Sequence, residues 1–284
     1  MTPFLALQHD ADALSAGLPP LMAAADRLAA SVSLGVHGRR RAGQGESFWQ
    51  FRRYGTNDAT SAIDWRQSAK SQHIFVRERE WEAAQTVWLW RDASANMAFQ
   101  SGTVSKRARA DLLLLALASL LVRGGERTGF IGMDGAPSAS RAAITRIGHA
   151  LFAPQDAALP PPAPLARGSH LVWFSDFLND SAGAAMTALS HAGIHGHLVR
   201  IVDPAEEDFP YTGRTRFESP TDGAEEVIGR AERVCEQYRH RFAAHGEAIA
   251  ATAAKLGWSI TVHRTDHSAQ SALIALHAAL GWNS

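Results

Sequence analysis

Residues 86–96 read TVWLWRDASAN, and this stretch decides the fold. Its first part, Thr86 to Arg91, is a short apolar run of β-prone residues, which is typical of a strand buried on both faces of a parallel sheet. The run stops at Asp92. Two later apolar runs also stop at an aspartate: His170 to Ser175 at Asp176, and His197 to Val202 at Asp203.

Helical segments lie between the strand-like runs. Lys106 to Arg123 has helical length, and the pair Gly124-Gly125 follows it as a stop signal. Further helices are expected over 141–152, 182–191, 225–256 and 268–280, further strands over 128–133 and 258–264, and an edge strand over 213–218. This alternation predicts an α/β fold, a doubly wound and mostly parallel sheet with helices on both faces.

The loop after the first strand carries three oxygen-bearing side chains at alternate positions, Asp92, Ser94 and Asn96. Ligands bind such sheets at the carboxyl ends of strands, so Asp176 is expected to face the same place. Carboxylate, hydroxyl and amide oxygens suit Mg²⁺, Mn²⁺ or Ca²⁺ rather than zinc. We therefore expect a degenerate site for one of these ions. The alternative is that each aspartate only caps a helix or forms a turn.

Composition excludes several classes of protein. The 284 residues hold 28 Lys and Arg against 28 Asp and Glu, so a protein that coats nucleic acid is not expected. The single cysteine, Cys235, excludes a disulfide framework. There is no GxxxxGKS/T phosphate-binding motif, and the longest apolar run, 112–122, is too short to span a bilayer. The start has no signal-peptide pattern, and we expect a cytoplasmic protein.

The first part of the chain differs from the rest. Residues 39–80 hold nine Lys and Arg against five acids, with aromatic residues interleaved. Such a segment can bind nucleic acid, fill its own core with the aromatics, or dock on an acidic partner, since Arg and aromatic residues make strong interface contacts. We divide the chain into an N-terminal basic–aromatic α+β module, residues 1–84, and an α/β domain, residues 85–284.

The loop Asp92-x-Ser94-x-Asn96 resembles the metal-site loop of von Willebrand factor A domains, Asp-x-Ser-x-Ser, with Asn96 in place of the last serine. In that family a Thr and an Asp after the fourth strand complete the site. Asp176 matches the Asp by context, and no residue is identified as the Thr. The resemblance implies a von Willebrand factor A-like domain, with Mg²⁺ held by the loop and Asp176.

A series of motifs upstream resembles, in order, the bacterial family called Domain of Unknown Function 58. They are Gly43-Gln-Gly45-Glu46-Ser-Phe48, Arg53-Tyr54, Asp58, Ile63-Asp64-Trp65-Arg66, Ser68-Ala69 and Val76-Arg77-Glu78. The resemblance implies an adaptor that acts with a MoxR-type AAA ATPase in the maturation or assembly of a client protein, without established catalysis. The candidate partner-binding residues are Arg53, Tyr54, Asp58, Asp64, Trp65 and Arg66.

Several functions remain open at this point. The leading hypothesis is a non-catalytic adaptor that engages proteins through the loop of residues 92–96. The alternatives are a metal-assisted hydrolase acting on a phosphate or acyl substrate, and weak nucleic-acid binding by residues 39–80. The group His191, His195 and His197 offers another metal site, but no acidic or cysteine partner accompanies it.

Overall fold

A computed structural model describes residues 20–32, 48–55, 60, 63–79 and 84–280. The chain divides into two compact units, residues 37–84 and residues 1–36 together with 85–284. The sequence analysis assigned residues 1–84 to one module, whereas the helix over residues 20–32 packs within the larger unit.

The larger unit is built on a five-stranded sheet in which each pair of neighbouring strands is parallel. In spatial order the strands are β4 (Arg127–Phe130), β3 (Thr86–Arg91), β5 (His170–Ser175), β6 (His195–Val202) and β9 (Ser259–Arg264). The predicted α/β fold with a mostly parallel sheet is therefore confirmed. The chain passes from β3 to β4 on one side and then to β5, β6 and β9 on the other, so the strand order reverses between β3 and β5.

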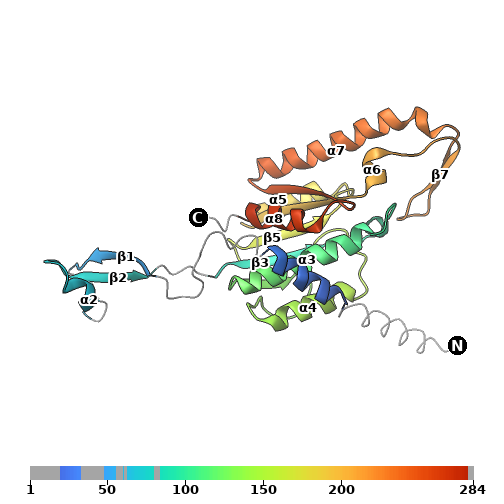
Figure 1. The fold of residues 1–284 in the computed structure, drawn as a ribbon. Helices are drawn as coiled ribbons and strands as arrows, with labels where there is room; N and C mark the ends of the chain where they lie inside the picture. Colours follow the sequence, from blue (N-terminus) through green and yellow to red (C-terminus); the bar gives the residue numbers. More distant parts are fainter. Residues whose placement is uncertain (1–19, 33–47, 56–59, 61–62, 80–83, 281–284) are drawn as a thin grey trace, which may run out of the picture. The chain divides into compact units, whose positions relative to one another are not determined.

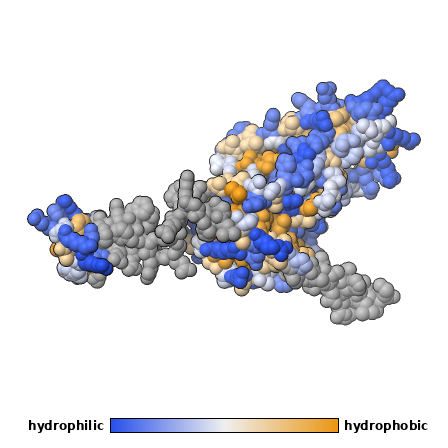
Figure 2. Space-filling view, in the orientation of Figure 1, coloured by the Kyte–Doolittle hydropathy of each residue, from blue (hydrophilic) through white to orange (hydrophobic). Residues whose placement is uncertain are grey.

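Helices cover both faces of this sheet. On one face α3 (Lys106–Arg123) contacts α4 (Arg141–Phe152) and α8 (Ala269–Ala279). On the other, α5 (Ala182–His191) contacts α7 (Cys235–Lys255). Figure 1 shows α7 and α3 on opposite sides of the strands. The surface over α7 is mostly hydrophilic in Figure 2, and the helix buries only Ile249 and Ala253.

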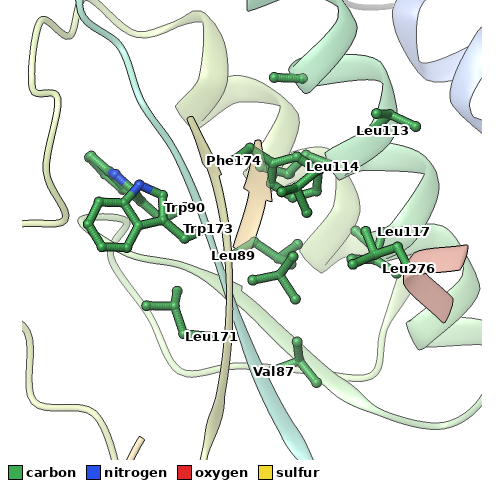
Figure 3. Packing of buried hydrophobic residues seen from close by; sticks show 14 of the residues in the cluster. Val87, Leu89, Trp90, Leu113, Leu114, Leu117, Leu171, Trp173, Phe174 and Leu276 are labelled. Carbon is green, nitrogen blue, oxygen red and sulfur yellow. The ribbon is translucent and has the colours of Figure 1, made fainter. Parts of the chain in front are cut away.

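Side chains alternate between the two faces, as the strand period requires. Leu89 and Phe174 lie toward α3, whereas Trp90 and Trp173, which are paired in register on β3 and β5, lie on the opposite side (Figure 3). Trp173 is fully buried. Because both faces are covered, these strands read as continuous apolar runs in the sequence.

The apolar run of α3 is explained by burial around the whole helix. Its inner side packs on the sheet, and the helix over residues 20–32 packs on it as well, with Ala25 and Ala29 in the same core. Asp26 accepts hydrogen bonds from Ser119 at 2.9 Å and from Arg123 at 3.1 Å, which fixes this contact. Among the residues with described positions, no helix is both long and apolar enough to cross a membrane.

The segment before α7 departs from the prediction. A helix was expected over 225–256, but residues 225–228 form β8 (Glu225–Ile228), which pairs antiparallel with β7 (Thr215–Glu218), and α7 begins at Cys235. The edge strand expected over 213–218 thus pairs with β8 and not with the parallel sheet. The β-branched residues Val227 and Ile228 favour a strand, and Gly229 separates them from the helix.

The smaller unit contains an antiparallel pair, β1 (Phe48–Arg53) and β2 (Phe75–Arg79), and the short helix α2 (Trp65–Ser68). Asp64 caps this helix, because its carboxylate accepts the N–H of Gln67 at 3.0 Å. The hydroxyl of Ser68 accepts the N–H of Phe75 at 2.9 Å and ties the helix to β2.

Candidate functional site

Two of the predicted site residues lie at the same carboxyl edge of the sheet. Arg91 of β3 pairs with Phe174 of β5, and the N–H of Asp92 donates to the Phe174 carbonyl at 2.8 Å. Asp176 follows Ser175, the last residue of β5. Both aspartates are almost fully buried, with 1% and 4% of their surface exposed. The strand order reverses between these two strands, where open parallel sheets place their ligands.

The carboxylate of Asp92 is held by its own loop and by β5. Its Oδ1 accepts the backbone N–H of Ser94 at 2.8 Å, and its Oδ2 accepts the hydroxyl of Ser175 at 2.6 Å. Burial raises the pKa of Asp92, hydrogen bonds from Ser175 and Ser94 oppose the rise, and the charge of Asp176 adds to it. The bond from Ser94 closes a turn, which is one of the two roles expected for Asp92 from the sequence.

The third residue of the predicted loop, Asn96, is bonded elsewhere. It lies in the 3-10 turn η2 (Ala95–Ala98), which the buried Met97 anchors in the core. Its Oδ1 accepts the hydroxyl of Thr221 at 3.1 Å, from the loop between β7 and β8. The structure thus brings Asp92, Ser94 and Asp176 to one edge, while the amide of Asn96 contacts a different loop.

Lys106, which the sequence analysis missed, is the main partner of Asp176. It is the first residue of α3 and is fully buried. Its Nζ donates to Oδ2 of Asp176 at 2.9 Å and to Oε1 of Glu206. Burial lowers the pKa of Lys106, but the charges of the two carboxylates outweigh this and leave the pKa above its ordinary value. A cation in the first turn of a helix opposes the helix dipole, and this was the sequence signal for a carboxylate partner.

The third strand-ending aspartate, Asp203, caps a helix. Its carboxylate accepts the N–H of Ala205 at 2.9 Å at the start of α6 (Pro204–Asp208). The carboxylate of Glu206 in turn accepts the N–H of Asp203 at 3.0 Å, which completes a capping box. Asp203 also accepts the N–H of Ser101 at 2.9 Å and the Ser101 hydroxyl. Burial raises the pKa of Glu206, and the charge of Lys106 opposes that rise.

The residues at this edge do not suit the Mg²⁺ ion that the resemblance implies. Each carboxylate oxygen of Asp92 and of Asp176 accepts a hydrogen bond from the protein. The one not yet described is the bond that Oδ1 of Asp176 accepts from the N–H of Leu178 at 3.0 Å. A divalent ion bound to Asp176 would lie beside the buried ammonium group of Lys106, and the two positive charges would repel each other strongly where water is excluded. In the described ranges, no group of three or more His, Cys, Asp or Glu is arranged to hold a metal.

The candidate partner-binding residues lie in the smaller unit. Trp65 is 67% exposed, and Arg53 and Arg66 are also exposed. Tyr54 and Asp64 are half-buried, and Asp64 has the capping role described above. Asp58 lies outside the described residues. The side chains of the basic and aromatic residues over 39–52 also lie outside the described ones.

Two of the three histidines singled out in the sequence, His195 and His197, lie with His170 at the opposite, amino-terminal edge of the sheet. His170 Nδ1 and His197 Nε2 are 3.1 Å apart, and the two rings stack with centroids 5.3 Å apart. His197 Nδ1 is also 2.8 Å from the hydroxyl of Ser259. Burial, with smaller contributions from His170 and His195, lowers the pKa of His197 to about 4. The nitrogens of His197 are thus both engaged by protein groups.

Comparison with known proteins gives a family and several solved structures. The family model described as "Protein of unknown function DUF58" matches residues 50–248, well over half of the chain. No curated protein matches the chain.

Two of these solved structures come from species of Bacteroides, and each alignment covers 70% of this chain and 99% of the other. The conserved hypothetical protein BatB from Bacteroides thetaiotaomicron is 18% identical, with a TM-score of 0.38. An aerotolerance-related membrane protein from Bacteroides fragilis NCTC 9343, with multiple mutations to serines, is 19% identical, with a TM-score of 0.39.

Proposed function

The chain belongs to the DUF58 family of proteins of unknown function, and from this membership we propose that it is a non-catalytic adaptor. It binds a MoxR-type AAA ATPase and presents a client protein to it. The larger unit has a von Willebrand factor A-like fold in this proposal, and the protein acts in the cytoplasm. The ATPase partner, the client, the fold family and the cellular location are all proposed from the resemblance of the motifs between residues 43 and 97 to this family.

The exposure of Trp65 carries the proposal. A tryptophan side chain that is 67% exposed loses most of the hydrophobic stabilisation that burial would provide. Asp64 caps α2, and Ser68 ties α2 to β2, so the turn that bears Trp65 is fixed by hydrogen bonds. Arg66 is exposed beside it. Tryptophan and arginine are the residue types that contribute most to binding at protein interfaces, which supports a docking role for this helix.

The carboxyl edge of the sheet supports the absence of catalysis. A general base needs a carboxylate or imidazole that can reach a substrate proton. The carboxylates of Asp92 and Asp176 are instead buried and occupied by Ser94, Ser175 and Lys106. This edge therefore serves the fold in our proposal, and the interaction with the ATPase is assigned to the smaller unit.

A binding measurement with the full chain tests the proposal. A purified MoxR-type AAA ATPase from the same genome is passed over the immobilised chain, and the affinity is compared with that of Trp65→Ala. We expect the substitution to weaken binding by at least about tenfold, as for an interface tryptophan. Val262→Ala is the matched control, because Val262 is 59% exposed but lies on β9 of the larger unit. It should bind like the wild type.

Three results would contradict the proposal. If the ATPase does not bind, it is not the partner, and if Trp65→Ala binds as tightly as the wild type, α2 is not the docking element. Turnover of a phosphoester or ester by the purified chain with Mg²⁺, lost in Asp92→Ala, would show an enzyme. Cell fractionation tests the cytoplasmic location.

A further inference from the structure

The carboxyl edge of the sheet contains a group of charged residues, here called the edge cluster. It consists of Asp92, Lys106, Asp176, Asp203 and Glu206, which come from the ends of three strands and the starts of two helices. Four of the five are 4% exposed or less, and the side chain of Glu206 is 13% exposed. The charge of Asp176 raises the pKa of both Asp92 and Glu206, so these buried carboxylates repel one another and favour a positive charge among them.

Lys106 supplies that charge from inside the cluster. Its Nζ is bonded to both Asp176 and Glu206, which lie 70 and 100 residues away in the chain, and none of its side chain is exposed. Bonds between an ammonium group and carboxylates are shorter and stronger than neutral ones. The Nζ of Lys106 also lies over the ring of Phe99, 5.8 Å from the ring centroid. The ammonium group is thus shielded from water and fixed between two acids.

The remaining oxygens of the edge cluster are also occupied. Asp92 is bonded to Ser94 and Ser175, and Asp203 is bonded to Ser101 and Ala205. The second oxygen of Glu206 accepts the N–H of Asp203, and that of Asp176 accepts the N–H of Leu178. No carboxylate oxygen of the cluster lacks a donor within the described part of the chain.

A divalent ion at this edge would lie beside the ammonium group of Lys106. Like charges at such short range repel strongly where water is excluded. The hydrogen bonds to the carboxylates are a weaker obstacle, because a carboxylate oxygen can accept a hydrogen bond and still bind a cation. The turn that carries Lys106 is fixed by Ser105, which caps α3 by accepting the N–H of Ala108 at 3.1 Å.

We propose that Lys106 is the resident cation of the edge cluster and takes the place of a divalent metal ion. Its ammonium group joins the end of β5 to α6 and α3, as a metal bound by residues from several elements would. The edge is then complete without a metal, and contacts that a partner makes there do not depend on divalent ions. This inference concerns the sheet edge alone and holds whether or not Trp65 binds the ATPase.

Thermal unfolding of the full chain with and without divalent ions tests this inference. The wild type is expected to melt at the same temperature in chelator and in millimolar Mg²⁺ or Mn²⁺, and calorimetry should detect no binding of either ion. Lys106→Ala should melt at a lower temperature and recover part of the loss when Mn²⁺ is added, because Asp176 and Glu206 then face a vacant position. Lys255→Ala, at the exposed end of α7, is the control and should change neither result.

Three outcomes would overturn the inference. The first is a wild type that Mg²⁺ or Mn²⁺ stabilises, with the effect lost in Asp176→Asn. The second is a folded Lys106→Ala that is as stable as Lys255→Ala and indifferent to both ions. The third is a Lys106→Arg variant, which keeps the positive charge, that folds only when a divalent ion is present. If Lys106→Ala does not fold, the measurements on the wild type and on Lys106→Arg still decide whether Lys106 takes the place of a metal ion.

Discussion

Acidification should destabilise the larger unit through His197. This side chain is 9% exposed, and its two ring nitrogens lie 3.1 Å from His170 and 2.8 Å from the hydroxyl of Ser259. Burial lowers the pKa of His197 to about 4, from the 6.5 of an exposed histidine. The imidazole is therefore neutral in the folded protein at a pH where it is charged in the unfolded chain.

The direction and size of this change in the free energy of unfolding follow from proton linkage. A histidine whose pKa is lowered on folding does not reduce the free energy of unfolding well above pH 6.5. It reduces that free energy increasingly as the pH falls from 6.5 toward 4. At about pH 5 the expected loss in the free energy of unfolding is about 2 kcal/mol, and below pH 4 it reaches about 3 kcal/mol. Loss of this size is a substantial part of the stability of an ordinary domain.

Urea denaturation at about pH 7.5 and about pH 5 measures this effect in the wild type and in His197→Gln. Glutamine keeps hydrogen-bonding capacity but does not titrate. Asp92 and Glu206 have raised pKa values, which act in the opposite direction, but they are present in both proteins and cancel in the difference. The stability of the wild type relative to the variant should fall by about 2 kcal/mol between the two pH values.

A control variant distinguishes His197 from histidines in general. His240→Gln removes an exposed histidine on α7 and should leave the pH dependence of the wild type unchanged. If the pH dependence of His197→Gln runs parallel to that of the wild type, the burial of a neutral His197 is not a source of pH sensitivity, and this reasoning is refuted.

Three further substitutions test the interior, each by the free energy of unfolding in urea. Arg91→Met leaves Asp111, whose side chain is only 14% exposed, without the ion pair now formed at 2.8 Å, and about 3–5 kcal/mol should be lost; a loss below about 1 kcal/mol would contradict this. Trp173→Ala should cost about 3–5 kcal/mol, since the side chain is fully buried, and a near-neutral effect would mean that this core is not packed as described. Gly196→Ala places a Cβ against the Trp258 ring and should cost about 1–3 kcal/mol; unchanged stability would show that the ring has room to move.

The strands of the parallel sheet could be predicted because their signal is local. Each is buried on both faces, so each appears as an apolar run in the sequence, and β3 and β5 begin and end where the runs do. The prediction failed at 225–228, where Glu225 and Glu226 read as part of a helix. Their strand forms only because it pairs with β7, and that pairing is a contact between two segments.

The candidate site shows the same division. The meeting of Asp92 with Asp176 could be predicted, because both follow strands of one parallel sheet and such strands end at the same edge. The position of Asn96 against Thr221, in a distant hairpin, could not be predicted. The place of Lys106 in the first turn of a helix indicated a carboxylate partner, but the identity of that partner could not be predicted, because Asp176 and Glu206 lie far away in the sequence.

The amino-acid sequence by itself determined the alternation of strands and helices, the family, and the set of acids that end the strands, because these depend on the periodicity and order of neighbouring residues. Only the tertiary structure decided what those acids do. Burial removes water from Asp92, Asp176 and Glu206, and the energy of each carboxylate then depends on the donor that the fold brings to it. For Asp176 and Glu206 that donor is Lys106, and its positive charge takes the place of a metal ion in our proposal.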